Sequence, residues 1–197
     1  QKGSIYGFLA LIFSREVTSD FLNELRTPHF LGVLEELGVD LGESFYTQVA
    51  SELLEELAVE YTGLFIGPGH FISPHESVHH VRDDGDYGRL WGADTVAVKK
   101  FVEATGLNYR SSFSGMPDHI AVELEFVQNL EERRVRAGID GDGELAENLE
   151  QIRQRFLQEH LLAWTPSFLE KVAARATMPF YREMALLASQ FLAGEQE

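Results

Sequence analysis

The apolar residues of this chain recur with a helical period along nearly its whole length, and this pattern constrains the fold more than any other feature. Apolar stripes spaced three and four residues apart run through residues 5–12, 45–64, 145–164 and 180–191. In a helix this spacing places the apolar side chains on one face. No segment shows the period-two alternation of a half-buried strand. The sequence therefore predicts an all-α fold.

Proline and glycine residues predict where the helices begin and end. We expect one long helix from about Glu43 to Leu64, because its apolar stripe is unbroken. The segment Gly67–Pro74 contains two glycines and two prolines and is predicted to be a loop. Pro117 is expected to open a helix that runs to about Arg136, since proline suits the first helical position. Pro166 is expected to break the helix before it.

The length and composition favour one helical domain over residues 1–197. The chain has 197 residues, of which 44% are hydrophobic, and this supplies one sizeable core. No apolar run reaches the roughly 18 residues that a membrane span needs, and the apolar start of the chain is interpreted as a helix. The core is predicted to contain Phe8, Leu57, Tyr61, Leu124, Ile152, Phe156, Leu161 and Trp164.

The charge and the lack of cysteine exclude several classes of function. The net charge is −16, from 32 acidic and 16 basic residues, so the chain repels nucleic acids and anionic lipids and favours a basic partner. Solubility alone also explains such a charge. The absence of cysteine excludes disulfides and thiolate-bound metals and is compatible with a cytoplasmic location. No segment has the pattern of a phosphate-binding loop, so no cofactor is predicted.

The segment His75–His79 matches the H-E-x-x-H pattern of zinc hydrolases. In those enzymes two histidines on one helical face bind zinc and the glutamate acts as a general base. Here the motif follows a loop of glycine and proline and precedes Asp83-Asp84-Gly85, so little room is left for the required helix. A zinc-dependent hydrolase is thus the alternative function. The favoured interpretation has no catalytic residue and no metal site, although His70 and His80 leave adventitious metal binding open.

Asp118 and His119 form a candidate ligand site. They are expected in the first helical turn after Pro117, where backbone N–H groups are free and a carboxylate is favoured. Glu123 is expected one turn further on the same face. The alternative is that Asp118 only caps the helix. His160 shares a helical stripe with apolar neighbours and is interpreted first as a core histidine.

Three segments together resemble the TorD/DmsD/NarJ family of molybdoenzyme-assembly chaperones. The first runs from Glu60-Tyr-Thr-Gly-Leu-Phe-Ile-Gly-Pro68 to Pro74-His-Glu-Ser-Val78. The second is Met116-Pro-Asp-His-Ile-Ala-Val-Glu-Leu124, and the third is Phe156-Leu-Gln-Glu-His-Leu161 with Trp164. Their order and separation make the resemblance specific.

This resemblance implies an all-α fold of about ten helices and a cytoplasmic chaperone without enzymatic activity. Its partners would be the twin-arginine signal peptide and the catalytic subunit of a molybdopterin oxidoreductase, with a peripheral contact to the export machinery. The chaperone would assist cofactor insertion and delay export. By motif, the family's peptide site would comprise Tyr61, Leu64, Phe65, Gly67, Pro68, Pro74, Ser77, Asp118, His119 and Glu123.

Overall fold

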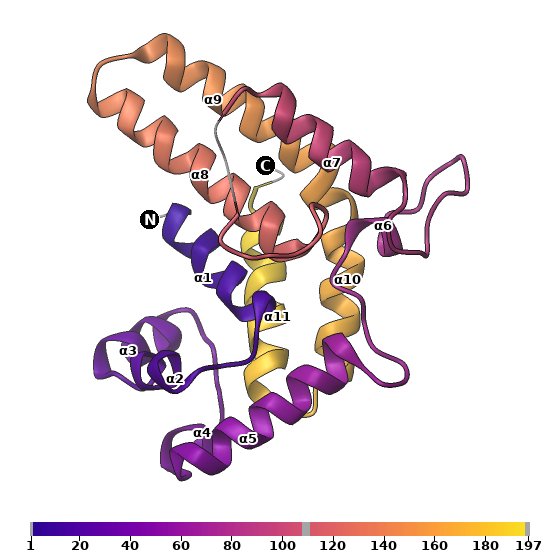
Figure 1. Ribbon diagram of the computed structural model, residues 1–197. Helices are drawn as coiled ribbons and strands as arrows, with labels where there is room; N and C mark the ends of the chain where they lie inside the picture. The colour runs from indigo at the N-terminus through magenta and orange to yellow at the C-terminus, as the bar shows by residue number, and fades with distance from the viewer. Residues whose placement is uncertain (1, 108–110, 196–197) are drawn as a thin grey trace. The chain divides into compact units, whose positions relative to one another are not determined.

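The protein is helical in all the segments that the structure describes. A computed structural model describes residues 2–107 and 111–195 (Figure 1). Within these residues the backbone forms helices and turns, and an isolated bridge joins His75 to His119 in place of any strand. The predicted all-α fold is confirmed. None of the described helices is long and apolar enough to cross a membrane. The chain divides into two compact units, described in turn, and the expectation of one domain stays a prediction.

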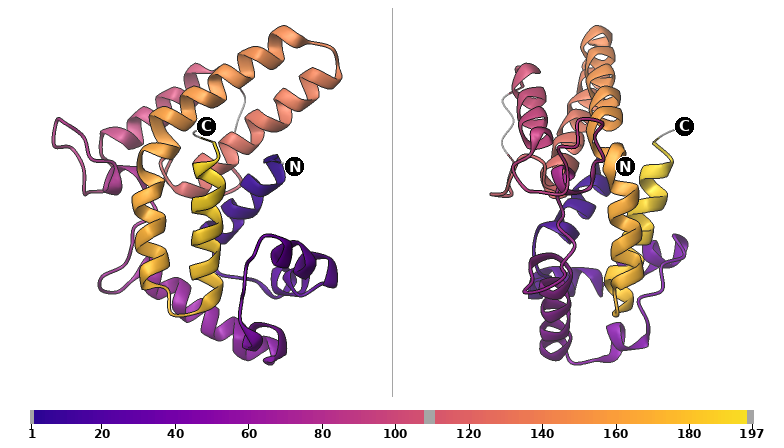
Figure 2. Two further views of the ribbon diagram at one scale, coloured as in Figure 1. Left: turned by 180° about the vertical axis from the view of Figure 1, so that it is seen from behind. Right: turned by 90° about the vertical axis from the view of Figure 1, so that its right-hand side faces the viewer.

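The first unit comprises the described residues up to Ser14 together with residues 74–167. Its elements are α1 (Lys2–Ser14), α6 (Glu76–His79), α7 (Ala93–Ala104), α8 (Ile120–Ile139), α9 (Gly143–Phe156), the π-helical turn η2 (Leu157–Leu161) and the beginning of α10 (Leu162–Arg175). The views in Figures 1 and 2 show α8 and α9 as an antiparallel pair, and α1 packs against α8.

A tight turn and buried aromatic rings hold the α8–α9 pair together. Gly141 has φ of +79°, and Asp142 caps α9 by accepting a 3.0 Å hydrogen bond from the N–H of Leu145. Phe126 on α8 and Phe156 on α9 are fully buried, and their ring centroids lie 4.8 Å apart at 70°. Burial of each such ring contributes about 1.5–3 kcal/mol.

The second unit comprises residues 15–73 and the described residues from Phe168 onward. Its elements are α2 (Ser19–Leu25), α3 (Pro28–Glu36), α4 (Glu43–Thr47), α5 (Ala50–Tyr61), the π-helical turn η1 (Thr62–Ile66), the remainder of α10 and α11 (Pro179–Ala193). Thr18 and Thr27 cap α2 and α3 with their hydroxyl groups. The rings of Phe45 and Phe180 stack at 5.6 Å, so α4 and α11 share a core.

The expected single helix from Glu43 to Leu64 is wrong, because the chain leaves the helical conformation at Gln48. Gln48 has ψ of 150°, so α4 ends at Thr47 and α5 begins at Ala50. The guanidinium of Arg26 donates to the carbonyl groups of Phe45 at 2.8 Å and Gln48 at 3.0 Å. These bonds satisfy carbonyl groups that a continuous helix would have paired internally, and this stabilises the break.

Pro166 does not break the helix, contrary to expectation. It is the fifth residue of α10, which continues to Arg175. The π-helical turn η2 lies directly before α10 and already changes the backbone hydrogen-bond ladder. Proline and π-helical turns both bend a helix without necessarily ending it. Pro166 deprives the Leu162 carbonyl of its helical N–H donor, and the Thr165 hydroxyl donates to the neighbouring Leu161 carbonyl at 2.6 Å.

Most of the predicted core is buried. Six of the eight residues are at most 5% exposed, namely Leu57, Tyr61, Leu124, Phe156, Leu161 and Trp164. Phe8 and Ile152 are only half-buried. Leu145, which lies on the same apolar stripe as Ile152, is 44% exposed, because it sits in the first turn of α9 near the hairpin tip.

Replacing Phe156 with alanine should destabilise the protein by about 3–5 kcal/mol, since the cavity left behind cannot be filled by neighbouring rings. Leu145→Ala is the matched control, and the exposure of Leu145 predicts a loss below about 1 kcal/mol. Urea denaturation measures both free energies of unfolding. Equal losses of unfolding free energy in the two variants would contradict the assignment of Phe156 to the buried face of α9 and of Leu145 to an exposed position.

Candidate functional site

The first motif segment places its apolar residues inside the second unit. Tyr61 ends α5, and Leu64 and Phe65 lie in η1; each is at most 5% exposed. The ring centroids of Tyr61 and Phe65 lie 5.1 Å apart, and Phe65 lies 6.2 Å from Phe168. Tyr61 and Phe65 therefore belong to a buried aromatic cluster that anchors η1, and Leu64 is buried beside Phe65 in the sequence. Single π-helical turns occur frequently at functional sites.

The loop after η1 exposes side chains that the sequence did not single out. Gly67, with φ of +97°, and Pro68 belong to the loop that was predicted to border the peptide site, and both are accessible. Ile66 is 60% exposed and Phe71 is 45% exposed on either side of them. Ile66 follows the end of the helix expected from the apolar stripe, and Phe71 lies in a segment without periodicity, so the sequence pattern indicates neither as a contact residue.

A groove with a volume of about 740 Å³ lies in the second unit beside η1. It is lined by Glu52, Glu55, Glu56, Val59, Glu60, Gly63, Leu64, Arg175, Thr177 and Met178. Glu60 is held in place, because its carboxylate accepts hydrogen bonds from the backbone N–H groups of Thr177 and of Met178, the latter at 2.8 Å. Val59 is 69% exposed at the groove. The groove thus joins acidic and apolar groups.

In the first unit, the segment after Pro74 is tied to the start of α8. The N–H of Glu76 donates to the carbonyl of Asp118 at 2.9 Å, and the N–H of Ile120 donates to the carbonyl of Pro74 at 2.9 Å. The Asp118 carboxylate accepts the N–H of Ser77 at 3.1 Å. Asp118 and Ser77 are fully buried. These bonds join residues 74–77 to residues 118–120. The two segments contain the predicted site residues Pro74, Ser77, Asp118 and His119.

Pro117 does not open the helix, and the expected positions of Asp118 and His119 are wrong. α8 begins at Ile120, and His119 is its cap, with Nδ1 accepting the N–H of Ala121 at 3.1 Å. Asp118 is directed at Ser77 and not at its own helix. Burial, followed by the charge of His75, lowers the pKa of His119 to about 3. His119 is therefore neutral near pH 7 and supplies no pH dependence there.

Glu123 lies in the interior, with no exposed surface. Its Oε2 accepts a hydrogen bond from Trp164 Nε1 at 3.1 Å, so it does not orient His119 as expected. Burial, followed by the charge of Glu76, raises the pKa of Glu123 well above its ordinary value. His160, expected as a core histidine, is 5% exposed and its Nδ1 lies 3.1 Å from Glu76 Oε2.

The residues of the H-E-x-x-H segment have separate partners. The ring of His75 packs edge-on against His119 at 4.9 Å, and the ring of His79 stacks on Trp164 at 5.8 Å. Glu76 faces His160 and His80. Within residues 2–107 and 111–195, the side chains close enough to share an ion are Glu76, His80 and Asp94, and not the two histidines of the motif.

Several buried polar atoms near α6 have no hydrogen-bond partner among the described residues. They are Ser77 Oγ, Asp94 Oδ2, Thr95 Oγ1, Asp118 Oδ1 and Glu123 Oε1. Each such atom destabilises a fold by about 1–3 kcal/mol. Buried polar atoms are normally paired, so these five atoms mark the polar part of the interior of this unit.

Comparison with known proteins identifies the family. Residues 31–170 match the family model described as nitrate reductase delta subunit, and this match spans more than half of the chain. The chain belongs to the nitrate reductase delta subunit family. The resemblance to the molybdoenzyme-assembly chaperones is thereby confirmed.

Relatives of known name support this membership. The chaperone protein TorD of Photobacterium profundum is 28% identical over 100% of this chain and 96% of its own length. TorD of Vibrio atlanticus is 28% identical over 99% of this chain and 96% of its own length. These relatives are named as chaperones, which agrees with the prediction that the chain is not an enzyme.

A solved structure shares the fold. A candidate redox enzyme maturation protein from Archaeoglobus fulgidus superposes with a TM-score of 0.54 at 24% identity, over 98% of this chain and 94% of that chain.

Two of the three family motifs coincide with π-helical turns, since Leu64 and Phe65 lie in η1 and His160 lies in η2.

Replacing Glu123 with glutamine should stabilise the protein at neutral pH by about 1–3 kcal/mol. Since the folded-state pKa of this acid is raised, the native state loses stability as pH rises above the unfolded value near 4.5. Glutamine keeps an acceptor for Trp164 and is neutral at both pH values, so it has no ionised form for burial to disfavour. Urea denaturation should show a higher free energy of unfolding for this variant at pH 7 but not at pH 4. The exposed Glu147→Gln is the control and should change neither value. A lower free energy of unfolding at both pH values would contradict the prediction.

Proposed function

We propose that this chain is a chaperone for the assembly of a molybdenum enzyme and that it binds the twin-arginine signal peptide of the precursor. Membership of the family and the names of the TorD relatives support the role in maturation. Peptide binding would take place in the cytoplasm and delay export until the cofactor is inserted. The catalytic subunit of the molybdenum enzyme is the partner, with a peripheral contact to the export machinery.

The groove beside η1 is the observation that carries the proposal. A twin-arginine signal peptide has a basic start followed by an apolar segment. Glu52, Glu55 and Glu56 are exposed at the groove and can attract the basic start. Val59 and Met178 line the same groove and offer apolar surface. The net charge of −16 adds a long-range attraction for a basic peptide.

The loop residues 67–73 of the second unit follow η1, whose Gly63 and Leu64 line the groove. Ile66 and Phe71 flank Gly67 and Pro68 and present exposed apolar side chains. We assign direct contact with the peptide to these accessible residues. The role of positioning η1 and the loop then belongs to the buried residues Tyr61, Leu64 and Phe65.

The predicted site residues of the first unit have a positioning role in this proposal. Pro74, Ser77, Asp118, His119 and Glu123 are buried, so their side chains hold the 74–79 segment and the start of α8. Direct recognition of the peptide by Asp118 and His119, expected from the motif, would require this segment to open.

Neutralising two groove carboxylates should weaken peptide binding. Glu55→Gln with Glu56→Gln removes about 1–2 kcal/mol of charge attraction, which is about tenfold in affinity. The probe is a synthetic peptide with two adjacent arginines followed by a leucine-rich segment, titrated calorimetrically. Glu144→Gln with Glu147→Gln removes the same charge from exposed positions on α9 and should leave the affinity nearly unchanged.

The difference between these two variants should shrink at high salt, because exposed charges are screened. Equal weakening in both variants would show that net charge alone attracts the peptide and would remove the groove as the site. Absence of binding by the unsubstituted protein would overturn signal-peptide recognition itself.

Asp118 separates positioning from direct contact. Asp118→Asn retains an oxygen that can accept the Ser77 N–H, whereas Asp118→Ala leaves this N–H unpaired at a loss of about 1–3 kcal/mol. If Asp118 positions the segment, the asparagine variant keeps near-normal peptide affinity and the alanine variant loses both stability and affinity. If Asp118 pairs with a peptide arginine, both variants lose affinity. Thermal melts and the same titration give the two readouts.

A further inference from the structure

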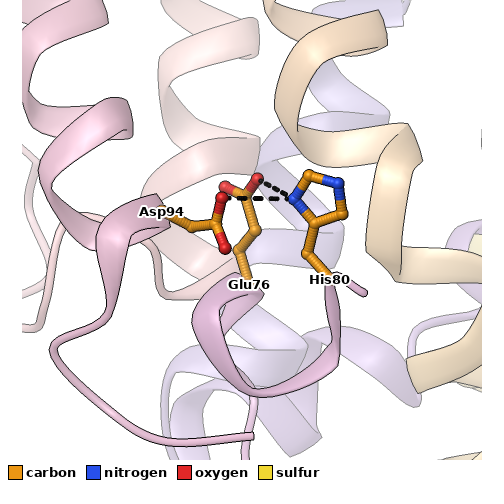
Figure 3. Close-up of side chains that lie close together, drawn as sticks. All are labelled: Glu76, His80 and Asp94. Atoms are coloured by element: carbon orange, nitrogen blue, oxygen red, sulfur yellow. Dashed lines mark hydrogen bonds and ion pairs between the residues drawn. The ribbon is translucent and has the colours of Figure 1, made fainter. Parts of the chain in front are cut away.

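Glu76, His80 and Asp94 converge in the first unit to form an N/O cluster (Figure 3). Glu76 and His80 are four residues apart, so the single turn of α6 directs both to one side. Asp94 is the second residue of α7, and α6 and α7 pack together. His80 Nδ1 lies 3.3 Å from Glu76 Oε1 and 3.2 Å from Asp94 Oδ1. One ring nitrogen therefore faces two carboxylates.

These distances match the ligand spacing around a small metal ion. Zinc binds imidazole nitrogen and carboxylate oxygen at about 2.0–2.1 Å in tetrahedral geometry, which separates ligand atoms by about 3.3 Å. The three ligand atoms lie within 4.8 Å of one another. A modest rotation of either carboxylate would bring all three onto one ion.

The burial of the cluster also favours a cation. Glu76 is fully buried and Asp94 is 2% exposed, so two carboxylates share a site of low polarity. Asp94 Oδ2 has no hydrogen-bond partner among the described residues, although it is buried. His80 Nδ1 lies between the two carboxylates, whose other partners are His160 for Glu76 and Arg82 for Asp94. A divalent ion would satisfy both carboxylates at once.

The cluster has an outer support and an open side. His160 Nδ1 lies 3.1 Å from Glu76 Oε2 and can orient that carboxylate, as residues behind metal ligands commonly do. His80, Asp94 and His160 line a cavity of about 720 Å³, which gives an ion a route of entry and leaves a coordination position free.

Arg82 competes with a metal ion for Asp94. Its Nη1 lies 2.9 Å from Asp94 Oδ1, while its Nη2 lies 2.7 Å from the exposed Asp84. The side chain of Arg82 is 28% exposed, so it can leave Asp94 and keep its pair with Asp84. Without metal, Arg82 supplies part of the positive charge that the carboxylates need.

We propose that Glu76, His80 and Asp94 bind a divalent transition-metal ion, of which zinc is the type, in exchange for the contact between Arg82 and Asp94. Mixed nitrogen and oxygen ligands suit such ions better than magnesium or calcium, which prefer oxygen alone. This site revises the expectation of no metal site, and it uses His80 in place of the two histidines of the H-E-x-x-H segment. It does not depend on the proposed peptide function.

Zinc titration of the chelator-treated full chain tests the proposal. Calorimetry should show one zinc ion per chain, with magnesium failing to compete. His80→Ala and Asp94→Asn should each weaken zinc binding about tenfold or more. His75→Ala and His79→Ala are matched controls and should bind zinc normally. Arg82→Gln should bind zinc more tightly than the unsubstituted protein, because a competing cation is removed.

Circular dichroism shows whether a ligand substitution disturbs folding. If it does, Arg82→Gln still tests the proposal, because it leaves all three ligands in place. A simple ion-pair network predicts the opposite result, since loss of Arg82 then lowers stability without any zinc-dependent recovery of the melting temperature. Zinc binding that survives in folded His80→Ala, or that is lost with His75→Ala or His79→Ala, overturns the proposal. So does the absence of one-to-one binding.

Discussion

The hydrogen bonds between the 74–77 segment and residues 118–120 are the constraint on which the first unit depends. Two backbone bonds and the Asp118 carboxylate fix this segment, which comprises two residues outside regular structure and the start of the single-turn helix α6. As a result Glu76 is directed into the interior, beside His160. The polar residues of the second and third motifs therefore act together. Asp118 holds the 74–77 segment against the start of α8, and His160 pairs with Glu76 of that segment.

This arrangement places two carboxyl groups where burial disfavours their ionised form. Glu76 and Glu123 are fully buried, and burial raises the pKa of both carboxyls. A fold selected only for stability would replace such groups by apolar ones. Their presence, with several unpaired polar atoms nearby, is explained more simply by a function of this region, either in positioning the loop or in holding an ion.

The second unit combines a rigid support with an accessible surface. Tyr61, Leu64 and Phe65 are buried, and the chain then emerges at Ile66 and Phe71. The change occurs across the π-helical turn η1, whose hydrogen bonds span one residue more than those of an α-helix and so alter the direction of the side chains that follow. Binding loops on rigid supports lose less entropy when a ligand orders them.

The sequence by itself determined the helical class, most of the buried stripe and the family, because periodicity and motif order are local properties of the chain. It did not determine that α4 ends at Thr47, that Pro166 continues a helix, or that Asp118 points to Ser77. Each of these depends on a partner distant in sequence or on a change of backbone ladder. The meeting of Glu76, His80 and Asp94 also depends on tertiary structure, because it requires α6 and α7 to pack together. Sequence spacing alone could not show that His80, rather than His75 or His79, would face the two carboxylates.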